Sequence, residues 1–431
     1  MKILRHTDRG FSKSIRVLNR ISEPTPEVQS TVREILEDVK KRGDSMLIHY
    51  TEKFGGGKLK PARLRVSDKE IAAALSSLSS QVRRAIVAAR SNVLKFAKQS
   101  LRKSWSTQNA QGATVGERFD PFERVGIYVP GGTAPLVSSA VMTGTLALAA
   151  KVPEIVATTP GDAEGKINPV LLAALSLCGA TEIYRLGGAQ AIAALAYGTK
   201  TIASVRKVFG PGNAYVVEAK RQVFGTVAVD LLPGPSEVLV IADSSAHPEW
   251  IAADLLAQSE HGQGSIAILL TDSTQQLEAV RKAVEDQATL RSRTAQIATS
   301  LKNAHLILCS TMKQCIQLAN EFASEHVSIA TRKPESIAEK LTTSGAIFLG
   351  GISPVAGGDF LAGPSHVLPT GGAGKSFSGL TADQFQRRTS ILRFDETSLR
   401  KSLPLVKTFC AVEGLDAHAS SFAIRRDHGF F

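Results

Sequence analysis

The chain has 431 residues, which exceeds one compact domain because single domains usually hold about 100–150 residues. Hydrophobic residues make up 43% and charged residues 21%, a balance that excludes wholesale disorder. The longest mildly apolar stretch, residues 134–150, contains serines and threonines and is too short for a membrane span. The N-terminus lacks the apolar segment of a secretory signal, and the four cysteines form no CxxC pair. These features predict a protein of the reducing cytoplasm.

The net charge of +12 is concentrated in one quarter of the chain. Residues 1–103 carry 23 lysines and arginines against 10 acidic residues, whereas the remainder carries 28 against 29. Such a surface suits a nucleic acid or another anion. Solvated helix faces are the favoured interpretation, because neither interleaved aromatic residues nor a nucleic-acid-binding motif accompanies the charge.

The N-terminal part predicts helices that form a scaffold. Thr25 supplies an N-cap before Pro26, apolar residues then recur at helical spacing, and Gly43 ends the run. Ser67 and Glu70 have the spacing of a capping box at the start of a second helix. A further helix is expected to carry the basic residues that follow. None of these helices contains a group of residues with evident chemistry.

From about Glu123 onward, short apolar runs alternate with glycine-rich turns and alanine-rich helices. This alternation predicts α/β layers with mostly parallel strands. The expected strands are 125–129, 154–158, 182–186, 207–209, 238–242, 266–271, 305–309 and 346–349.

We therefore expect an α/β fold with two Rossmann-like parallel-sheet lobes that lack GxGxxG, an N-terminal helical arm and a C-terminal extension. Near the start of the extension, the small residues 371–380 predict flexibility, and residues from 381 to 388 predict a helix. The expected parts are an arm at 1–24, a discontinuous main domain at 25–129 and 237–372, a second domain at 130–236 and a tail at 373–431.

Three glycine-rich turns, 130–132, 187–190 and 210–213, each follow an expected strand and precede a helix. The amide groups and positive dipole end of a helix N-terminus suit phosphate groups. None of the turns has the GxGxxG spacing, and Pro369 stands where a GxxxxGKS loop ending at Lys375 and Ser376 requires glycine. On these residues alone, ordinary strand–helix connections and a nucleotide site are about equally supported.

Acidic, amide and imidazole side chains gather late in the chain. Gln258 and His261 share one face at the end of an expected helix, where together they suit a divalent ion. The adjacent Glu325 and His326 suit a carboxylate that activates water and a base near neutral pH. Taken singly, each group favours a polar helix end or a surface loop. Similar clusters occur at 357–359, 363–366 and 413–418.

Together, these segments resemble the histidinol dehydrogenase family over nearly the whole chain. The resemblance rests on FGPGN (209–213), GPSEV (234–238) and QSEHG (258–262), in an order that is specific to this family. Further matching segments are VGIYVPGG (125–132), GGAQAIAALA (187–196), SEH (324–326) and the stretch 358–370.

The resemblance implies one Zn²⁺ per subunit, held by nitrogen and oxygen ligands without cysteine. The implied ligands are Gln258, His261, Asp359 and His418, of which the last comes from the partner subunit of a homodimer. The resemblance further implies a substrate pocket lined by these metal ligands together with Ser236, His326, His366 and Glu413. It implies that NAD is contacted by Tyr128, Gln190 and Asn213. The implied catalytic residues are Glu325 and His326.

The implied reaction is the four-electron oxidation of L-histidinol through L-histidinal to L-histidine, with two NAD⁺ in turn, at the end of histidine biosynthesis. In this reaction His326 is the general base, Glu325 activates water, and zinc positions the substrate. The implied partner is a second copy of the chain that shares the active site, with no role for nucleic acid or a membrane.

Two alternatives to this function stay open. One is a family relative that oxidises another small alcohol with NAD, such as a sulfonated diol. Glu413 and His366 favour a substrate with cationic and imidazole groups, because a sulfonate requires arginine or lysine in the pocket. The other is a basic nucleic-acid-binding protein, which leaves the clusters of acidic residues and histidine unexplained.

Overall fold

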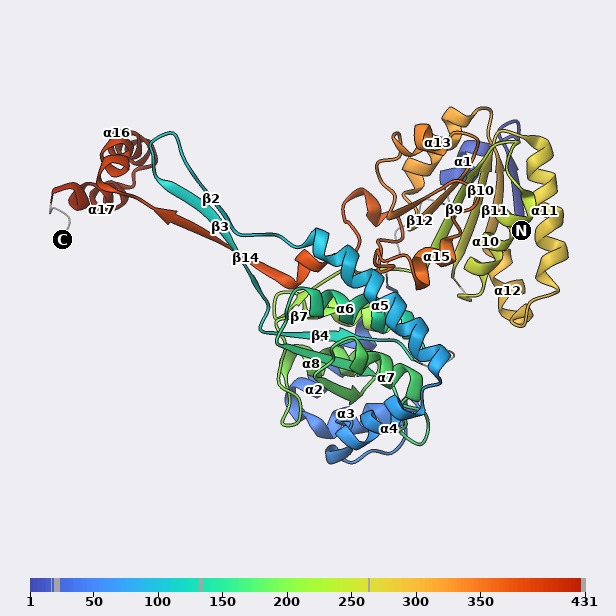
Figure 1. Ribbon diagram of the computed structural model, residues 1–431, viewed down its shortest axis with the longest axis horizontal. Coiled ribbons are helices and arrows are strands. Elements are labelled where there is room, and N and C mark those ends of the chain that lie inside the picture. The colour runs from blue at the N-terminus through green and yellow to red at the C-terminus, as the bar shows by residue number, and fades with distance from the viewer. Residues whose placement is uncertain (17, 19–23, 132–134, 263, 428–431) are drawn as a thin grey trace.

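The computed structural model describes residues 1–16, 18, 24–131, 135–262 and 264–427. Two α/β lobes lie next to each other, and a long arm extends from them with the C-terminal helices at its tip (Figure 1). We call the lobe with the six-stranded sheet lobe 1 and the lobe with the five-stranded sheet lobe 2. Within the described ranges, no helix is both long and apolar enough to cross a membrane.

Lobe 1 has a parallel sheet with helices on both faces. Val238 and Val240 pack in one hydrophobic cluster and Leu239 and Ile241 in the other, because successive side chains of a strand point to opposite faces. In spatial order the strands are β1 (Lys2–Arg5), β11 (Ala304–Leu308), β10 (Ile266–Thr271), β9 (Glu237–Ala242), β12 (His326–Ala330) and β13 (Ala346–Leu349). The covering helices are α10 (Pro248–Ser259), α11 (Thr274–Ala288) and α12 (Thr294–Ser300) on one face, and α1 (Phe11–Arg16), α13 (Met312–Phe322) and α14 (Pro334–Ala338) on the other.

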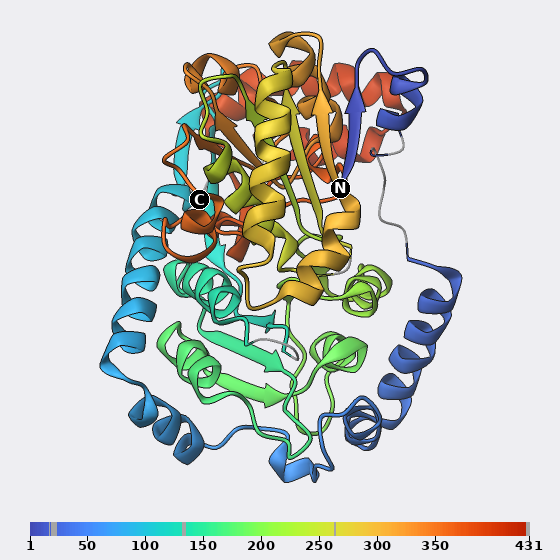
Figure 2. The same cartoon turned by 90° about the vertical axis from the view of Figure 1, so that its right-hand side faces the viewer.

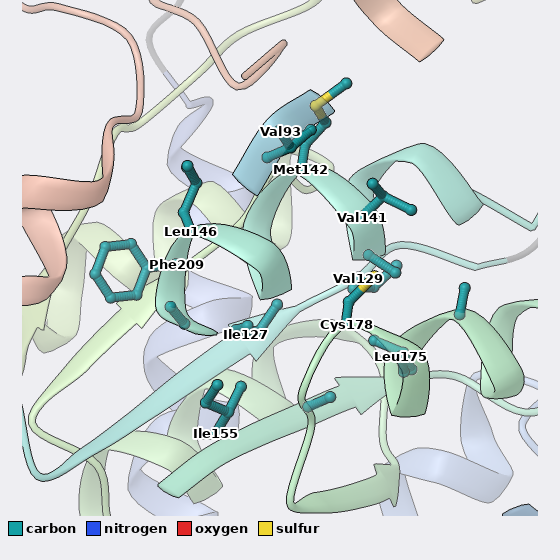
Figure 3. Packing of buried hydrophobic residues seen from close by; sticks show 14 of the residues in the cluster. Val93, Ile127, Val129, Val141, Met142, Leu146, Ile155, Leu175, Cys178 and Phe209 are labelled. Carbon is teal, nitrogen blue, oxygen red and sulfur yellow. The ribbon is translucent and has the colours of Figure 1, made fainter. Parts of the chain in front are cut away.

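Lobe 2 also has a parallel sheet between two layers of helices. On one face Ile127 and Ile155 of the sheet share a cluster with Val93 and Leu146 of the covering helices (Figure 3). The strands, in spatial order, are β6 (Glu182–Arg185), β5 (Glu154–Thr159), β4 (Arg124–Tyr128), β7 (Lys207–Phe209) and β8 (Ala228–Val229). The helices are α4 (Asp68–Ser77), α5 (Ser80–Ser100), α6 (Val137–Ala149) and α7 (Pro169–Leu177) on that face, and α2 (Pro26–Arg42), α3 (Asp44–Lys53), α8 (Gly188–Tyr197) and α9 (Ala214–Val223) on the other.

The helix ends follow the local signals in the sequence. Thr25 accepts a hydrogen bond from the backbone N–H of Val28 at 3.4 Å, and α2 ends at Gly43. Ser67 and Glu70 form the expected capping box at the start of α4. These caps satisfy backbone groups that a helix leaves without partners at its ends, so local chemistry places both helix starts.

The structure divides the chain differently from the prediction in three respects. The helices between residues 25 and 103 pack on lobe 2, since α2 lies against α8 and α9, and α5 lies against α6. β4 is the central strand of the lobe 2 sheet, although it was expected in the other domain. Residues 2–5 form the edge strand β1 of lobe 1 instead of belonging to a separate arm. Helices with one apolar face require a partner surface, and their own sequence does not say which sheet supplies it.

The arm is a three-stranded antiparallel sheet that carries two helices. Its strands are β2 (Trp105–Gln108), β3 (Thr114–Pro121) and β14 (Gln386–Arg393), and its helices are α16 (Glu396–Glu413) and α17 (Asp416–Asp427). The expected helix from 381 to 388 is therefore wrong, because only a short 3₁₀ turn (Ala382–Phe385) precedes β14. The reach of the C-terminal part comes from this sheet, while Gly371 is held by a hydrogen bond to Glu237 at 3.0 Å.

The two lobes share one strand order. In lobe 1 the chain passes from β9 to β10 and β11 on one side and then returns to β12 on the other. In lobe 2 it passes from β4 to β5 and β6 and returns to β7. The direction in which successive strands are added to the sheet thus reverses between β9 and β12 in lobe 1, and between β4 and β7 in lobe 2. In open parallel sheets ligands bind beside such a reversal, at the carboxyl ends of the strands.

Candidate active site

The expected catalytic pair lies at the amino end of one central strand of lobe 1, beside the amino end of its neighbour. Ser236 directly precedes β9, and Glu325 directly precedes β12, which begins at His326. Ser236 Oγ donates a hydrogen bond to Glu325 Oε2 at 2.6 Å, and the backbone N–H of Glu237 donates to the same oxygen at 2.9 Å. The strand β1 points from its amino end away from lobe 2 (Figure 2), and the other strands of the sheet are parallel to it. The edge of the sheet formed by the amino ends of the strands therefore faces lobe 2.

His326 is buried in a defined orientation. Its Nδ1 lies 3.0 Å from the backbone carbonyl oxygen of Glu237. A carbonyl oxygen only accepts, so Nδ1 carries a proton and the neutral ring has its free lone pair on Nε2. Nε2 is buried with no hydrogen-bond partner among the described residues, and it lies 3.5 Å from Asp359 Oδ1. This arrangement leaves Nε2 available as a base.

The environment of Glu325 opposes its ionisation. Burial raises the pKa of the Glu325 carboxyl, while the positive charge that His326 gains on protonation and the hydrogen bonds from Ser236 and Glu237 act in the opposite direction. A carboxyl group with a raised pKa is a stronger base in its ionised form and suits proton removal from water.

Three other expected residues surround this pair. Gln258, at the end of α10, has its Oε1 3.5 Å from Ser236 Oγ, and its buried Nε2 has no partner among the described residues. Asp359 lies in α15 (Val355–Phe360). His366 has a buried Nε2 that also lacks a described partner, and burial lowers the pKa of His366. The nearby charges of Asp359, His326 and His261 also act on His366, which places all four side chains in one region.

The donor atoms of this region match those of a zinc site. Gln258, His261 and Asp359 supply oxygen and nitrogen donors of the kinds that zinc accepts. Among the described residues, no group of three His, Cys, Asp or Glu side chains is placed to hold a metal ion.

The structure does not bring Glu413 and His418 to this region within one chain. Glu413 ends α16, His418 lies in α17, and both are exposed at the tip of the arm (Figure 1). The arm also exposes apolar side chains that a soluble monomer usually buries: Leu405 is 52% exposed, Phe409 70% and Val412 82%.

The residues expected to contact NAD lie at the carboxyl edge of the lobe 2 sheet. Tyr128 ends β4, and its buried hydroxyl accepts a hydrogen bond from the Gly188 N–H at 3.2 Å. Gln190 is buried in α8, and its Oε1 has no partner among the described residues. Asn213 caps α9, where its Oδ1 accepts from the N–H groups of residues 215 and 216 at 3.1 Å each. Of the turn 130–132, residue 132 lies outside the described residues.

Two buried ionic residues that the sequence analysis missed hold the turn before Asn213. The side chains of Lys220 and Asp230 form an ion pair and are fully buried. Asp230 Oδ2 accepts from the Gly210 N–H at 2.8 Å, and Lys220 Nζ donates to the Gly210 oxygen at 2.9 Å. Gly210 has φ +114°, and a side chain there would clash with the Tyr128 carbonyl oxygen. The sequence held one signal for this ion pair: Lys220 lies at helical spacing among the buried apolar residues of α9.

Glu237 was missed as well. Its backbone orients both Glu325 and His326, while its carboxylate accepts from the N–H groups of Glu325 at 3.4 Å and Gly371 at 3.0 Å. A charged residue that opens an otherwise apolar buried strand was the signal for it.

Comparison with known proteins shows the family of this chain. The sequence model of histidinol dehydrogenase matches residues 18–426. The chain belongs to the histidinol dehydrogenase family. A member from Agrobacterium fabrum is 45% identical over 419 residues, covering 97% of this chain and 96% of that protein. One from a Synechococcus species is 40% identical and covers 99% of both.

A solved structure of the family supports the same assignment. The crystal structure of histidinol dehydrogenase from Elizabethkingia anophelis has a TM-score of 0.94 and 36% identity, covering 99% of this chain and 98% of that chain. An acetylating aldehyde dehydrogenase from Geobacillus thermoglucosidasius, at 14% identity and TM-score 0.51, shares the fold alone. The protein is thus an enzyme of the oxidoreductase class, with the predicted α/β fold.

Proposed function

We propose that this enzyme oxidises L-histidinol through L-histidinal to L-histidine, the last steps of histidine biosynthesis, with NAD as hydride acceptor and one Zn²⁺ per subunit. Membership of the family supports this reaction. The observation that carries it is the buried Glu325–His326 pair, which is held by Ser236 and by the backbone of Glu237. Because all four cysteines are buried and unpaired, we also propose a reducing, cytoplasmic setting.

The two bases suit two different proton transfers. His326 Nε2 faces the metal-ligand side of the site and removes the substrate hydroxyl proton in the alcohol oxidation. Glu325 removes a proton from water, which adds to the bound aldehyde to give the gem-diol. His326 then takes the gem-diol hydroxyl proton in the second oxidation. Ser236 lies between Glu325 and Gln258 and is a substrate contact in this proposal.

The proposed metal ligands are Gln258, His261, Asp359 and the partner subunit's His418. When bound, zinc supplies Lewis acidity and a fixed point that orients the substrate. His366 lines the same region, and its lowered pKa keeps it neutral, so it suits hydrogen bonding to the polar groups of histidinol.

We place the NAD contacts at Tyr128, Gln190 and Asn213. The strand order of lobe 2 reverses between β4 and β7, and Tyr128 and Asn213 follow the carboxyl ends of these strands. NAD supplies the hydride acceptor for both oxidations. Gln190 Oε1, which is buried with no described partner, is an acceptor for a donor group of the cofactor.

We further propose a homodimer in which the arm of each subunit completes the site of the other with Glu413 and His418. Two exposed apolar surfaces support it. One is the arm helix face described above, and the other is next to Asp359, where Ile352 is 86% exposed and Phe360 63%. Covering both surfaces would remove a large apolar area from water.

A member of the family that oxidises a sulfonated diol is the alternative. Asp359 and Glu413 are carboxylates and none of the proposed pocket residues is an arginine or lysine, which suits a cationic imidazole substrate better than a sulfonate. The test is to supply purified enzyme with Zn²⁺, NAD⁺ and either L-histidinol or a sulfonated diol. Two NADH per histidine formed supports the proposal, whereas turnover of the diol alone contradicts it.

A further inference from the structure

Lobe 1 contains a cavity of about 810 Å³ at the edge of its sheet opposite to the active site. The cavity is lined by residues that follow the carboxyl ends of the central strands: Asp243 follows β9, Asp272 follows β10, and Arg332 and Lys333 lie beyond β12. The active site lies at the amino ends of β9 and β12. At about 3.3 Å per residue, the six residues of β9 separate the two by roughly 20 Å.

The position of this cavity corresponds to that of the proposed NAD site in lobe 2. β9 and β12 occupy the places that β4 and β7 occupy in lobe 2, so the cavity lies at the point where the strand order of lobe 1 reverses. Ligands of open parallel sheets bind at this position. Its volume is within the roughly 300–1,000 Å³ that is usual for small-molecule sites.

The charges of the cavity favour an anion. Four basic side chains line it, from Lys313, Arg332, Lys333 and Lys340. In the part of the chain that the structure describes, no ion pair is formed by any of the four. Two carboxylates, Asp243 and Asp272, also line the cavity, so four positive and two negative side chains give a net charge of +2. Asp243 is held in place by the backbone N–H groups of Ser245 at 2.9 Å and Arg332 at 3.0 Å.

Other lining groups suit the rest of a nucleotide. Met312, Ile316 and Ile337 offer an apolar surface for a base, and Asp272 is an exposed carboxylate of the kind that binds ribose hydroxyls. Thr331 Oγ1 lines the cavity as a buried atom without a partner among the described residues. α13 begins at the same edge, so the positive end of its dipole adds to the attraction for phosphate.

We propose that this cavity is a second ligand site, separate from the catalytic one, for a nucleoside phosphate. Arg332, Lys333, Lys313 and Lys340 bind the phosphate groups, Asp272 binds the ribose, and the apolar surface receives the base. The inference does not depend on the identity of the substrate, because it uses no residue of the active site.

The test measures binding of ADP, adenosine and inorganic pyrophosphate to the full-length enzyme by calorimetry. We expect ADP to bind most tightly, pyrophosphate less tightly and adenosine least. The variant Arg332→Glu/Lys333→Glu should lose at least about tenfold in affinity for ADP. The control Lys282→Glu/Lys302→Glu changes the charge of lobe 1 equally, at two exposed positions outside the cavity, and should stay within about twofold.

Hydrogen exchange then locates the bound ADP. Protection of residues 311–318 and 331–340 on adding ADP should occur in the wild type and the control, and should disappear in Arg332→Glu/Lys333→Glu. The KM for NAD should be the same in all three proteins. The proposal is overturned by absent ADP binding at millimolar concentration, by equal losses in both variants, by adenosine binding as tightly as ADP, or by protection confined to lobe 2.

Discussion

Replacing Lys220 by methionine tests whether a buried ion pair holds the proposed NAD turn. Methionine keeps most of the side-chain length and removes the ammonium group. The change deletes hydrogen bonds to the carbonyl oxygens of Gly210, at 2.9 Å, and Leu231, at 2.6 Å. It also leaves the Asp230 carboxylate buried next to the Gly210 N–H without its ion-pair partner.

The size of the effect follows from burial. Both side chains are fully buried, and removing one partner of such a pair costs about 3–5 kcal/mol because the other charge stays uncompensated. This is a large part of the about 5–15 kcal/mol that stabilises a typical folded protein. The double variant Lys220→Met/Asp230→Asn removes the lone charge and should recover part of the loss.

Urea unfolding followed by far-UV circular dichroism measures the change in the free energy of unfolding. The matched control is Lys69→Met, an exposed lysine on α4 of the same lobe, which should stay within about 0.5 kcal/mol of the wild type. The KM for NAD should rise in Lys220→Met, because the turn before Asn213 loses its anchor, while the KM for histidinol changes less. A loss below about 1 kcal/mol, or a double variant less stable than the single one, would refute the reasoning.

Four further outcomes are expected. Glu325→Gln should depress histidinol oxidation far more than the reduction of histidinal by NADH, which needs no hydration, whereas His326→Asn should impair both; equal losses would contradict the division of roles. Because burial raises the pKa of Glu325, histidinal oxidation should increase with pH beyond the ordinary glutamate range, and this limb should be absent from the pH profile of histidinal reduction. Dialysis against a chelator should abolish turnover and retain the helical circular dichroism signal, because the two hydrophobic cores of lobe 1 do not depend on the proposed ligands. Refolding a mixture of inactive His418→Ala and His261→Ala subunits should restore part of the activity through hybrid dimers, and hybrids that form without activity would exclude a shared site.

The sequence alone determined features that depend on neighbouring residues. The caps at Thr25 and Ser67 and the eight apolar strands are local, because helix ends and buried parallel strands have their own residue patterns. The adjacency of Glu325 and His326 predicted an acid–base pair, a role that stays a prediction. The structure places the two residues at the start of β12 instead of at a helix end. The family resemblance was likewise visible in short segments of the chain.

Tertiary structure alone decided what depends on distant segments. The strands of the arm are exposed and have no buried face, so β2, β3 and β14 show little of the apolar pattern that identifies a strand. An amphipathic helix or an apolar strand can pack on several surfaces of similar chemistry, and the sequence does not select one of them. Only the structure shows which sheet each helix covers, that β1 pairs with β11, and that the two lobes share a strand order. Lys220 meets Asp230 because the chain after α9 forms β8 beside β7, which brings Asp230 next to Gly210. A buried charge is stable only when such a partner exists.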